Sequence, residues 1–319
     1  MTPAAPRADA SQVDELEAGL LLEAIRARYG HDFLGYHRPT MMRRLALAKE
    51  RFSCRSLSML QDRVLHDRSV LSELVGLLTV QVSGMFRDPG YYRALRETVL
   101  PHLATWPSLK VWVAGCAEGE ELYSLAILFR EAGLEARSIF YATDISPAAL
   151  HKAEAGIYPL DRLQGFTESH HHAGGTSSLS DYYTAAYGAV AMDRTLRDRV
   201  VFSQHNLATD EVFAEVHLIS CRNVLIYFDQ ELQSRAIRLF RDSLARGGFL
   251  GLGSSETIRF SGHADVDELM QWLRGFEQAP RHTFVVHGEP EATDALRFRI
   301  GNELGWRASV PPYAQTVEA

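Results

Sequence analysis

The chain has 319 residues, of which 46% are hydrophobic and 23% are charged, and its formal net charge is -7 at pH 7. This is the composition of a globular protein long enough for more than one domain, and its acidic balance argues against a general nucleic-acid binder. The three cysteines are too few and too scattered for a disulfide framework or a zinc site. With no apolar segment suited to a signal peptide or a bilayer span, we expect a cytoplasmic protein.

The first part of the chain predicts helices. Residues 1–12 are rich in Ala, Pro and Ser, which indicates a disordered lead-in. Apolar residues then recur at helical spacing, Gly30 is a plausible stop, and Pro39 suits the first turn of a second helix. Further helical stretches lie near 57–65 and 70–78. We predict an all-helical N-terminal domain over 13–80, then a linker and first helix over 81–109.

After Lys110, short aliphatic runs alternate with helical segments. The predicted strands are 110–114, 138–143, 199–204, 216–220, 248–253 and 282–287, and the predicted helices are 120–132, 147–155 and 230–244. This alternation indicates βαβ units and a mostly parallel sheet, in an α/β domain over 110–288. Residues 158–199 interrupt it and predict a small inserted subdomain. Residues 289–319 have little pattern and predict a loosely packed C-terminal extension.

A glycine-bearing turn, Gly115 to Gly119, follows the first of these strands and leads into a helix at Glu120. Such a turn lets the backbone approach a ligand, and the helix N-terminus presents free N–H groups. The spacing differs from the dinucleotide fingerprint, and no P-loop lysine follows. Glu120 and Glu121 would repel a pyrophosphate and suit a ligand with a positive end, such as a sulfonium or an ammonium. The alternative is that they only complement the helix dipole.

Polar residues also follow three other predicted strands, at the edge where open α/β sheets bind ligands. Asp144 is placed to accept hydrogen bonds from ribose hydroxyls. It could instead cap the next helix, and Ser146 is a second candidate for that cap. Asn206 is suited to an adenine edge. The third group comprises Arg222, Asn223 and Tyr227. It could instead be a helix-capping loop in which the arginine has its partners within the protein.

Three further features carry charge. Arg87 lies in the linker and is suited to gripping a carboxylate, unless it pairs with Asp88 or serves as a domain-docking contact. The helix after Pro39 is basic, which favours a docking surface for an acidic partner as much as a solvated face. Its arginines are Arg43, Arg44, Arg51 and Arg55, of which the last three are predicted near one helical face. The run 170–172 of three histidines predicts an exposed loop and no metal site.

The motifs, in their order, resemble the chemotaxis receptor glutamate methyltransferases (CheR-type). They are P-T-M-M-R-R-L, M-F-R-D-P, A-G-C-x-E-G-E-E-x-Y-S-L-A-I, Y-A-T-D-I, A-x-x-G-I-Y, H-N-L, C-R-N-V-L-I-Y-F-D and L-G-S-S-E. The resemblance implies a helical N-terminal domain, a seven-stranded Rossmann-like S-adenosylmethionine methyltransferase sheet and a small inserted β subdomain. It also implies methyl transfer from S-adenosylmethionine to receptor glutamates, which forms glutamyl methyl esters and S-adenosylhomocysteine.

The resemblance also implies roles for individual residues. Arg87 and Tyr227 match the pair that lines the reaction centre, and the basic helix resembles a receptor-docking helix. The implied cofactor-contacting residues are Gln81, Ser83, Arg87, Gly115, Glu121, Asp144, Asn206, Leu207, Arg222 and Asn223. The chain departs from the family pattern at five places: Gln81 stands where the family has Asn, Ser83 where it has Thr, Ala117-Glu118 where it has Ser-Thr, Leu122 where it has Pro, and His217 where it has Asp.

The implied partner is a chemoreceptor-like protein with acidic methylation sites. We expect a monomer that meets the membrane only through this receptor and binds no nucleic acid or metal. Two alternatives stay open. One is a non-catalytic signalling module that binds S-adenosylmethionine or S-adenosylhomocysteine, and the other is a methyltransferase with a non-receptor substrate.

Overall fold

The structure is a computed structural model that describes residues 10–79 and 83–254, together with 256, 270, 273–274, 280, 283–284 and 290–309. The chain divides into two compact units, Met1–Glu256 and Thr257–Ala319. Each unit is described by itself.

The N-terminal part of the first unit consists of four helices, α1 (Ala10–Tyr29), α2 (Arg38–Arg51), α3 (Leu57–His66) and α4 (Arg68–Leu78). Local chemistry sets where three of them begin. Pro39 lies in the first turn of α2, the Ser56 hydroxyl accepts a hydrogen bond from Met59 N at 3.1 Å to cap α3, and Asp67 caps α4. The buried faces of the helices form one core, which includes Leu21, Ile25, Leu45, Leu60 and Leu74.

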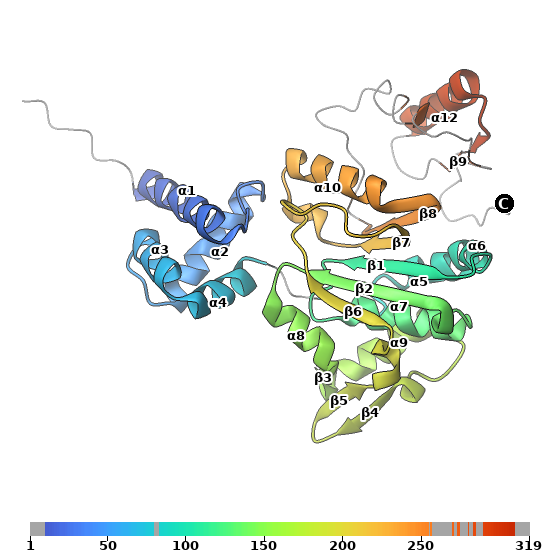
Figure 1. The fold of residues 1–319 in the computed structure, drawn as a ribbon, viewed down its shortest axis with the longest axis horizontal. Helices are drawn as coiled ribbons and strands as arrows, with labels where there is room; N and C mark the ends of the chain where they lie inside the picture. Colours follow the sequence, from blue (N-terminus) through green and yellow to red (C-terminus); the bar gives the residue numbers. More distant parts are fainter. Residues whose placement is uncertain are drawn as a thin grey trace, which may run out of the picture. The chain divides into compact units, whose positions relative to one another are not determined.

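The centre of the first unit is a five-stranded parallel sheet (Figure 1). Its strands are β1 (Leu109–Ala114), β2 (Ser138–Asp144), β6 (Val200–Gln204), β7 (Val216–Cys221) and β8 (Leu244–Leu252), in the order β6-β2-β1-β7-β8. Since all the strands run the same way, their carboxyl ends meet at one edge of the sheet. The predicted Rossmann-like α/β class is confirmed.

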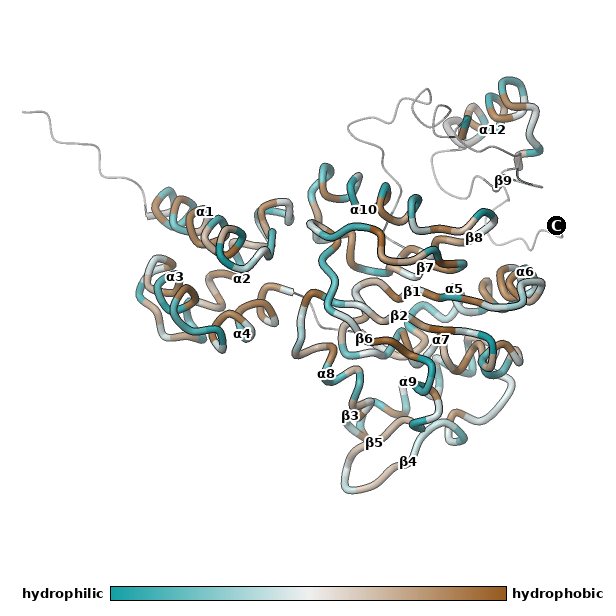
Figure 2. Tube along the Cα trace, in the orientation of Figure 1, coloured by the Kyte–Doolittle hydropathy of each residue, from teal (hydrophilic) through white to brown (hydrophobic). Residues whose placement is uncertain are grey.

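Helices flank this sheet. They are α5 (Pro89–Ala94), α6 (Leu100–Leu103), α7 (Glu120–Glu131), α8 (Pro147–Ala155) and α10 (Gln230–Ser243). α8 packs against β2 and β6, and α10 packs against β8. Hydrophilic and hydrophobic residues alternate along α10 (Figure 2), as expected for a helix with one face on the core. Its buried residues are Leu232, Ala236, Ile237, Leu239, Phe240 and Ser243.

The predicted insertion is confirmed as a small antiparallel sheet, β3 (Ile157–Pro159), β5 (Ala189–Met192) and β4 (Tyr183–Ala186), accompanied by α9 (Leu163–His172). A buried carboxylate ties it to α7: Glu131 accepts hydrogen bonds from Arg96 at 2.6 Å and from His170 at 3.0 Å. Burial alone would raise the pKa of Glu131, but these two partners outweigh it and hold the pKa at about 2.

The prediction of an exposed histidine loop holds only in part. His171 and His172 are exposed, but the run lies at the end of α9, and His170 is only 3% exposed because Glu131 and the ring of Phe86 pack against it. No cluster of His, Cys, Asp or Glu that could hold a metal occurs among the described residues.

The second unit holds α12 (Pro290–Leu304) and the short parallel pair β9 (Thr283–Phe284) and β10 (Ala308–Ser309). The predicted strand at 282–287 is thus not observed in the main sheet, which has five described strands instead of the implied seven; 282 and 285–287 lie outside the described residues. The prediction of a loosely packed C-terminal extension is wrong for 290–309, because α12 buries Ile300 against Met270 and Leu273, while 289 and 310–319 lie outside the described residues. No described helix is both long and apolar enough to cross a membrane.

Candidate functional site

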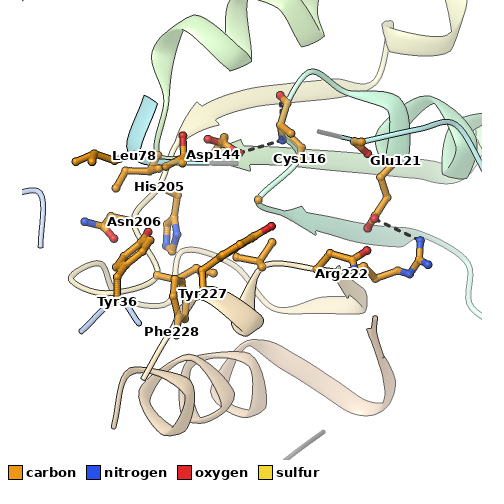
Figure 3. Close-up of a pocket in the computed structure, with 18 of the residues that line it drawn as sticks. Tyr36, Leu78, Cys116, Glu121, Asp144, His205, Asn206, Arg222, Tyr227 and Phe228 are labelled. Atoms are coloured by element: carbon orange, nitrogen blue, oxygen red, sulfur yellow. Dashed lines mark hydrogen bonds and ion pairs between the residues drawn. The ribbon is translucent and has the colours of Figure 1, made fainter. Parts of the chain in front are cut away.

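A cavity of about 900 Å³, its open mouth included, lies where the strands β1, β2, β6 and β7 end (Figure 3). Ten of the residues singled out from the sequence line it: Ser83, Arg87, Gly115, Glu121, Asp144, Asn206, Leu207, Arg222, Asn223 and Tyr227. Gln81 lies outside the described residues. The structure thus brings together side chains from the linker and from four strand ends.

The turn after β1 requires glycine at its first position. Gly115 has a φ of +72°, and a Cβ there would come within 2.5 Å of Val224 Cγ2. The turn is anchored to β2, since the amides of Gly115 and Cys116 both donate to the carbonyl of Thr143. Gly115 therefore lets the β1 turn pack directly against the loop that follows β7.

Asp144 is a cavity residue and not the cap of α8. Its carboxylate accepts hydrogen bonds from Ala117 N and from Ser146 N, both at 2.9 Å. Ser146 takes the capping role that the sequence left open, because its hydroxyl accepts from Ala149 N. A carboxylate oxygen can accept more than one hydrogen bond, so Asp144 keeps capacity for a ligand hydroxyl.

The two neighbouring glutamates have different environments. Glu121 lines the cavity, and its Oε1 is buried without a hydrogen-bond partner among the described residues. Glu120 is absent from the lining and pairs with Arg162 at 2.7 Å. The interpretation that both glutamates face a cationic ligand is thus wrong for Glu120. The pKa of Glu121 is raised by burial, against the effect of nearby Arg222.

Arg222 is an internal cation that organises one wall of the cavity. Its side chain is 1% exposed, and it contacts Asp88 Oδ2 at 2.8 Å and Glu121 Oε2 at 3.6 Å. Its guanidinium also lies 4.2 Å from the centre of the Tyr91 ring. Burial opposes the charge, but Glu121, Tyr92, Tyr91 and Asp88 together outweigh it and raise the pKa of Arg222. Because Arg222 holds Asp88, the alternative of an Arg87–Asp88 salt bridge is wrong, and in the described part of the chain Arg87 makes no ion pair.

The opposite end of the cavity offers an amide. Asn206 Oδ1 accepts from Ala208 N at 3.0 Å, whereas its Nδ2 is buried and has no partner among the described residues. Tyr36, Tyr227 and Phe228 lie together on one side, across from Asp144 and Cys116 (Figure 3). An unpaired buried donor costs free energy unless a ligand accepts from it. This part of the cavity is suited to a heterocycle with an acceptor nitrogen.

Two residues of this site escaped the sequence analysis. Tyr36 reaches the cavity from the segment before α2, and no sequence pattern links it to the sheet. Glu256 accepts four backbone hydrogen bonds and so fixes the loop after β7; the donors are Gly253, Asn223, Val224 and Leu225. The motif L-G-S-S-E contained Glu256 but gave no sign of its partners.

The basic residues do not form the predicted single face. Arg44 turns inward and donates to the carbonyls of Leu77 at 2.7 Å and Thr79 at 3.3 Å, at the end of α4. Arg51 pairs with Glu73. The helix α2 ends at Arg51, so Arg55 lies beyond it and the shared-face prediction is wrong. Of these four arginines, Arg43 and Arg55 are exposed and make no ion pair or hydrogen bond with the described residues.

The departures from the expected motif have local explanations. Glu118 pairs with Lys152 at 2.6 Å and lies outside the cavity lining. His217 Nδ1 accepts from Lys110 N at 3.0 Å, and burial lowers the pKa of His217, which favours the neutral ring needed for that bond. Leu122 is fully buried. At these positions the structure gives no sign of a disrupted cavity.

Comparison with protein-family models gives three matches. Residues 81–273 match the CheR methyltransferase SAM-binding domain, and residues 17–79 match the CheR methyltransferase all-alpha domain. Residues 254–311 match a third model, described as the RNA specificity domain of Zn-dependent metallo-hydrolases.

Several curated proteins are similar over most of their length. A Pseudomonas putida protein named as a methyltransferase, Cher3, is 51% identical over 251 residues, which cover 79% of this chain and 92% of that protein. A chemotaxis protein methyltransferase of Listeria monocytogenes is 36% identical over 60% of this chain and 71% of that protein. Chemotaxis protein methyltransferase 1 of Pseudomonas aeruginosa is 31% identical over 67% of this chain and 80% of that protein.

Proposed function

Since the chain belongs to the CheR methyltransferase family and has its S-adenosylmethionine-binding domain, we propose that it methylates glutamate side chains of a chemoreceptor-like protein. S-adenosylmethionine is its cofactor. Relatives named as chemotaxis protein methyltransferases support the chemotactic role. The observation that carries the proposal is that Arg87 and Tyr227 line the same cavity as the proposed cofactor residues.

The polar groups that line the cavity fit S-adenosylmethionine. The unpartnered Oε1 of Glu121 suits the ammonium group, and the carboxylate of Asp144, at the end of β2, suits the ribose hydroxyls. The unpartnered Nδ2 of Asn206 suits an acceptor nitrogen of the adenine. We propose that these residues, with Ser83, Gly115, Leu207, Arg222 and Asn223, hold the cofactor, and that Gln81 joins them.

When bound, S-adenosylmethionine supplies an electrophilic methyl group on a sulfonium, which is a good leaving group. The substrate glutamate needs no general base, because a carboxyl with a reference pKa of about 4.3 is already ionised at neutral pH. The protein therefore has to bind and orient the carboxylate. Positioning of this kind can supply roughly 7–11 kcal/mol.

Arg87 is the cation suited to this task. The other cavity arginine, Arg222, is occupied by Asp88 and Glu121, whereas Arg87 is exposed at the cavity and makes no ion pair among the described residues. We propose that the Arg87 guanidinium and the Tyr227 hydroxyl donate to the incoming carboxylate and leave one oxygen lone pair aimed at the methyl group. The cofactor held in this cavity would supply the methyl group for the ester and would leave as its neutral thioether.

Replacing Arg87 tests this role. Arg87→Ala should lower kcat by at least about 100-fold, since it removes the group that orients the nucleophile. The fold should persist, because the exposed Arg87 side chain supports no ion pair among the described residues. Arg238→Ala, an exposed arginine of α10, is the matched control. Near-normal turnover by Arg87→Ala, at an unchanged unfolding midpoint, would remove Arg87 from the mechanism.

We propose that the partner docks on the helical domain. The exposed Arg43 and Arg55 suit an acidic surface, whereas Arg44 and Arg51 are held by α4 and contribute less. We also propose that the protein is a cytoplasmic monomer, which meets the membrane only through its receptor.

The experiment for this proposal is a labelled-methyl assay on membranes that contain chemoreceptors. We expect label in the receptor that alkali releases as methanol, which is the signature of a glutamyl ester. Cofactor binding without transfer would instead support the non-catalytic module. Ester formation on another protein or on a small acid would support the alternative substrate.

A further inference from the structure

A short segment between α1 and α2 pairs with the segment that carries Tyr227. His37 N donates to the carbonyl of Tyr227 at 2.7 Å, and Asp229 N donates to the carbonyl of Gly35 at 2.7 Å. Between these two bonds, Tyr36 and Phe228 form an isolated antiparallel bridge, with ring centres 5.0 Å apart. The helical domain therefore contacts the reaction centre through the backbone and not only through side chains.

Among the described residues, the other backbone hydrogen bond of Tyr227 is local. Its amide donates to the carbonyl of Val224 at 3.1 Å, within η6 (Leu225–Tyr227), a single 3-10 turn. Such turns have poor hydrogen-bond geometry and little rigidity of their own. Within the described part of the chain, the donor to the Tyr227 carbonyl is His37 N. The helical domain thus fixes the side of this peptide that the 3-10 turn leaves free.

The same segment also forms a wall of the cavity. Tyr36 lies beside Tyr227 and Phe228 in Figure 3, and its other face is against Phe33, with ring centres 5.1 Å apart. Phe33 is fully buried in the core of the helical domain. A contiguous chain of contacts therefore runs from that core through Tyr36 to the backbone of Tyr227.

We propose that residues 35–37 are a positioning element of the active site, which sets the Tyr227 phenol against the substrate carboxylate through paired hydrogen bonds to residues 227 and 229. The inference rests on the proposed function, because that function gives Tyr227 its role. α2, the helix that carries the proposed docking residue Arg43, begins at Arg38, directly after this element.

Two pairs of substitutions isolate the two bonds. Proline lacks an N–H and prefers a φ near −65°, and the φ values of His37 (−54°) and Asp229 (−71°) already suit it. His37→Pro removes the donor to Tyr227, whereas His37→Ala keeps it, and both lose the side-chain contact with Thr40. Asp229→Pro removes the donor to Gly35, whereas Asp229→Ala keeps it, and both lose the cap on Leu232 N. In Asp229→Pro the residue before the proline is Phe228. Its φ of −95° and ψ of 147° are extended, which is the conformation that a residue before proline prefers.

The first readout reports on Tyr227 without any protein substrate. The full chain carries 3-fluorotyrosine at position 227, and its ¹⁹F spectrum is recorded with S-adenosylhomocysteine. We expect the alanine variants to keep the wild-type resonance and the proline variants to shift or broaden it. The wild type and all four variants are compared at equal occupancy of the ligand.

The second readout is kcat per S-adenosylhomocysteine-binding site, counted by calorimetry. Each proline variant should turn over about tenfold more slowly than its alanine partner, with a Kd for S-adenosylhomocysteine within about threefold of it. A merely structural role would instead reduce the number of binding sites and leave kcat per site unchanged.

Equal resonances and equal kcat per site within both proline and alanine pairs would overturn the proposal. If one proline variant fails to fold, the other pair decides, since its bond crosses the same bridge. If the wild type transfers no methyl group to receptor glutamates, the proposed function fails, while the ¹⁹F comparison still decides whether residues 35–37 position Tyr227.

Discussion

The loop after β7 depends on one buried carboxylate, and the substitution Glu256→Gln tests how much. Glu256 Oε2 accepts from Gly253 N at 2.6 Å and from Asn223 N at 2.8 Å. Its Oε1 accepts from Val224 N at 2.8 Å and from Leu225 N at 2.7 Å. The side chain is therefore surrounded by four donors, and a carboxylate is the group that can accept from all of them.

Glutamine has the same shape but only one acceptor oxygen. Whichever way the amide is turned, two backbone N–H groups lose their acceptor and face an NH₂ group. Each unsatisfied buried donor costs about 1–3 kcal/mol, so the substitution should cost about 2–6 kcal/mol. That is a large part of the stability of about 5–15 kcal/mol that is usual for a folded domain.

Urea unfolding of Glu256→Gln measures this cost, with Glu97→Gln, at an exposed glutamate, as the matched control. We also expect weaker binding of S-adenosylhomocysteine. Asn223, a proposed cofactor residue, has a φ of +61°, and the substitution weakens the hydrogen bonds that hold its loop in this conformation. A variant within about 0.5 kcal/mol of the control in stability would refute the reasoning.

Two further predictions follow from the same region and from the inserted subdomain. Gly115→Ala should lower the free energy of unfolding by about 2–5 kcal/mol, since the left-handed backbone costs about 1–2 kcal/mol and the close approach to Val224 about 1–3 kcal/mol more. An unchanged urea midpoint would contradict this. Glu131 has a pKa lowered from 4.5 to about 2, so its contribution to stability is present above pH 4.5 and lost as the pH falls toward 2. The difference in urea midpoint between wild type and Glu131→Gln should therefore shrink over that range, and a constant difference would show that Glu131 does not titrate there.

The sequence predicted the features that depend on neighbouring residues. Pro39 and the hydrophobic spacing indicated α2, and the alternation of apolar runs with helices indicated the parallel sheet. The carboxyl ends of its strands then indicated which side chains meet, because that edge follows from the strand direction alone. Asp144, Asn206 and Arg222 lie at this edge as predicted.

Features that depend on the rotation of a helix or on distant partners were beyond the sequence. Glu120 and Glu121 are adjacent on α7, and only the packing of that helix decides that Glu121 faces the cavity while Glu120 meets Arg162. His170 is buried because Glu131 lies across from it on another element. The pairing of residues 35–37 with 227–229 likewise arises only when the helical domain meets the sheet.

A crystal structure of the protein with S-adenosylhomocysteine tests the central claim most directly. We predict that the nucleoside lies between Asp144 and Asn206 and that the amino group contacts Glu121, with Arg87 and Tyr227 facing the sulfur. Ligand density at another place on the protein, or the sulfur turned away from Arg87 and Tyr227, would contradict the assignment of this cavity as the methyl-transfer site.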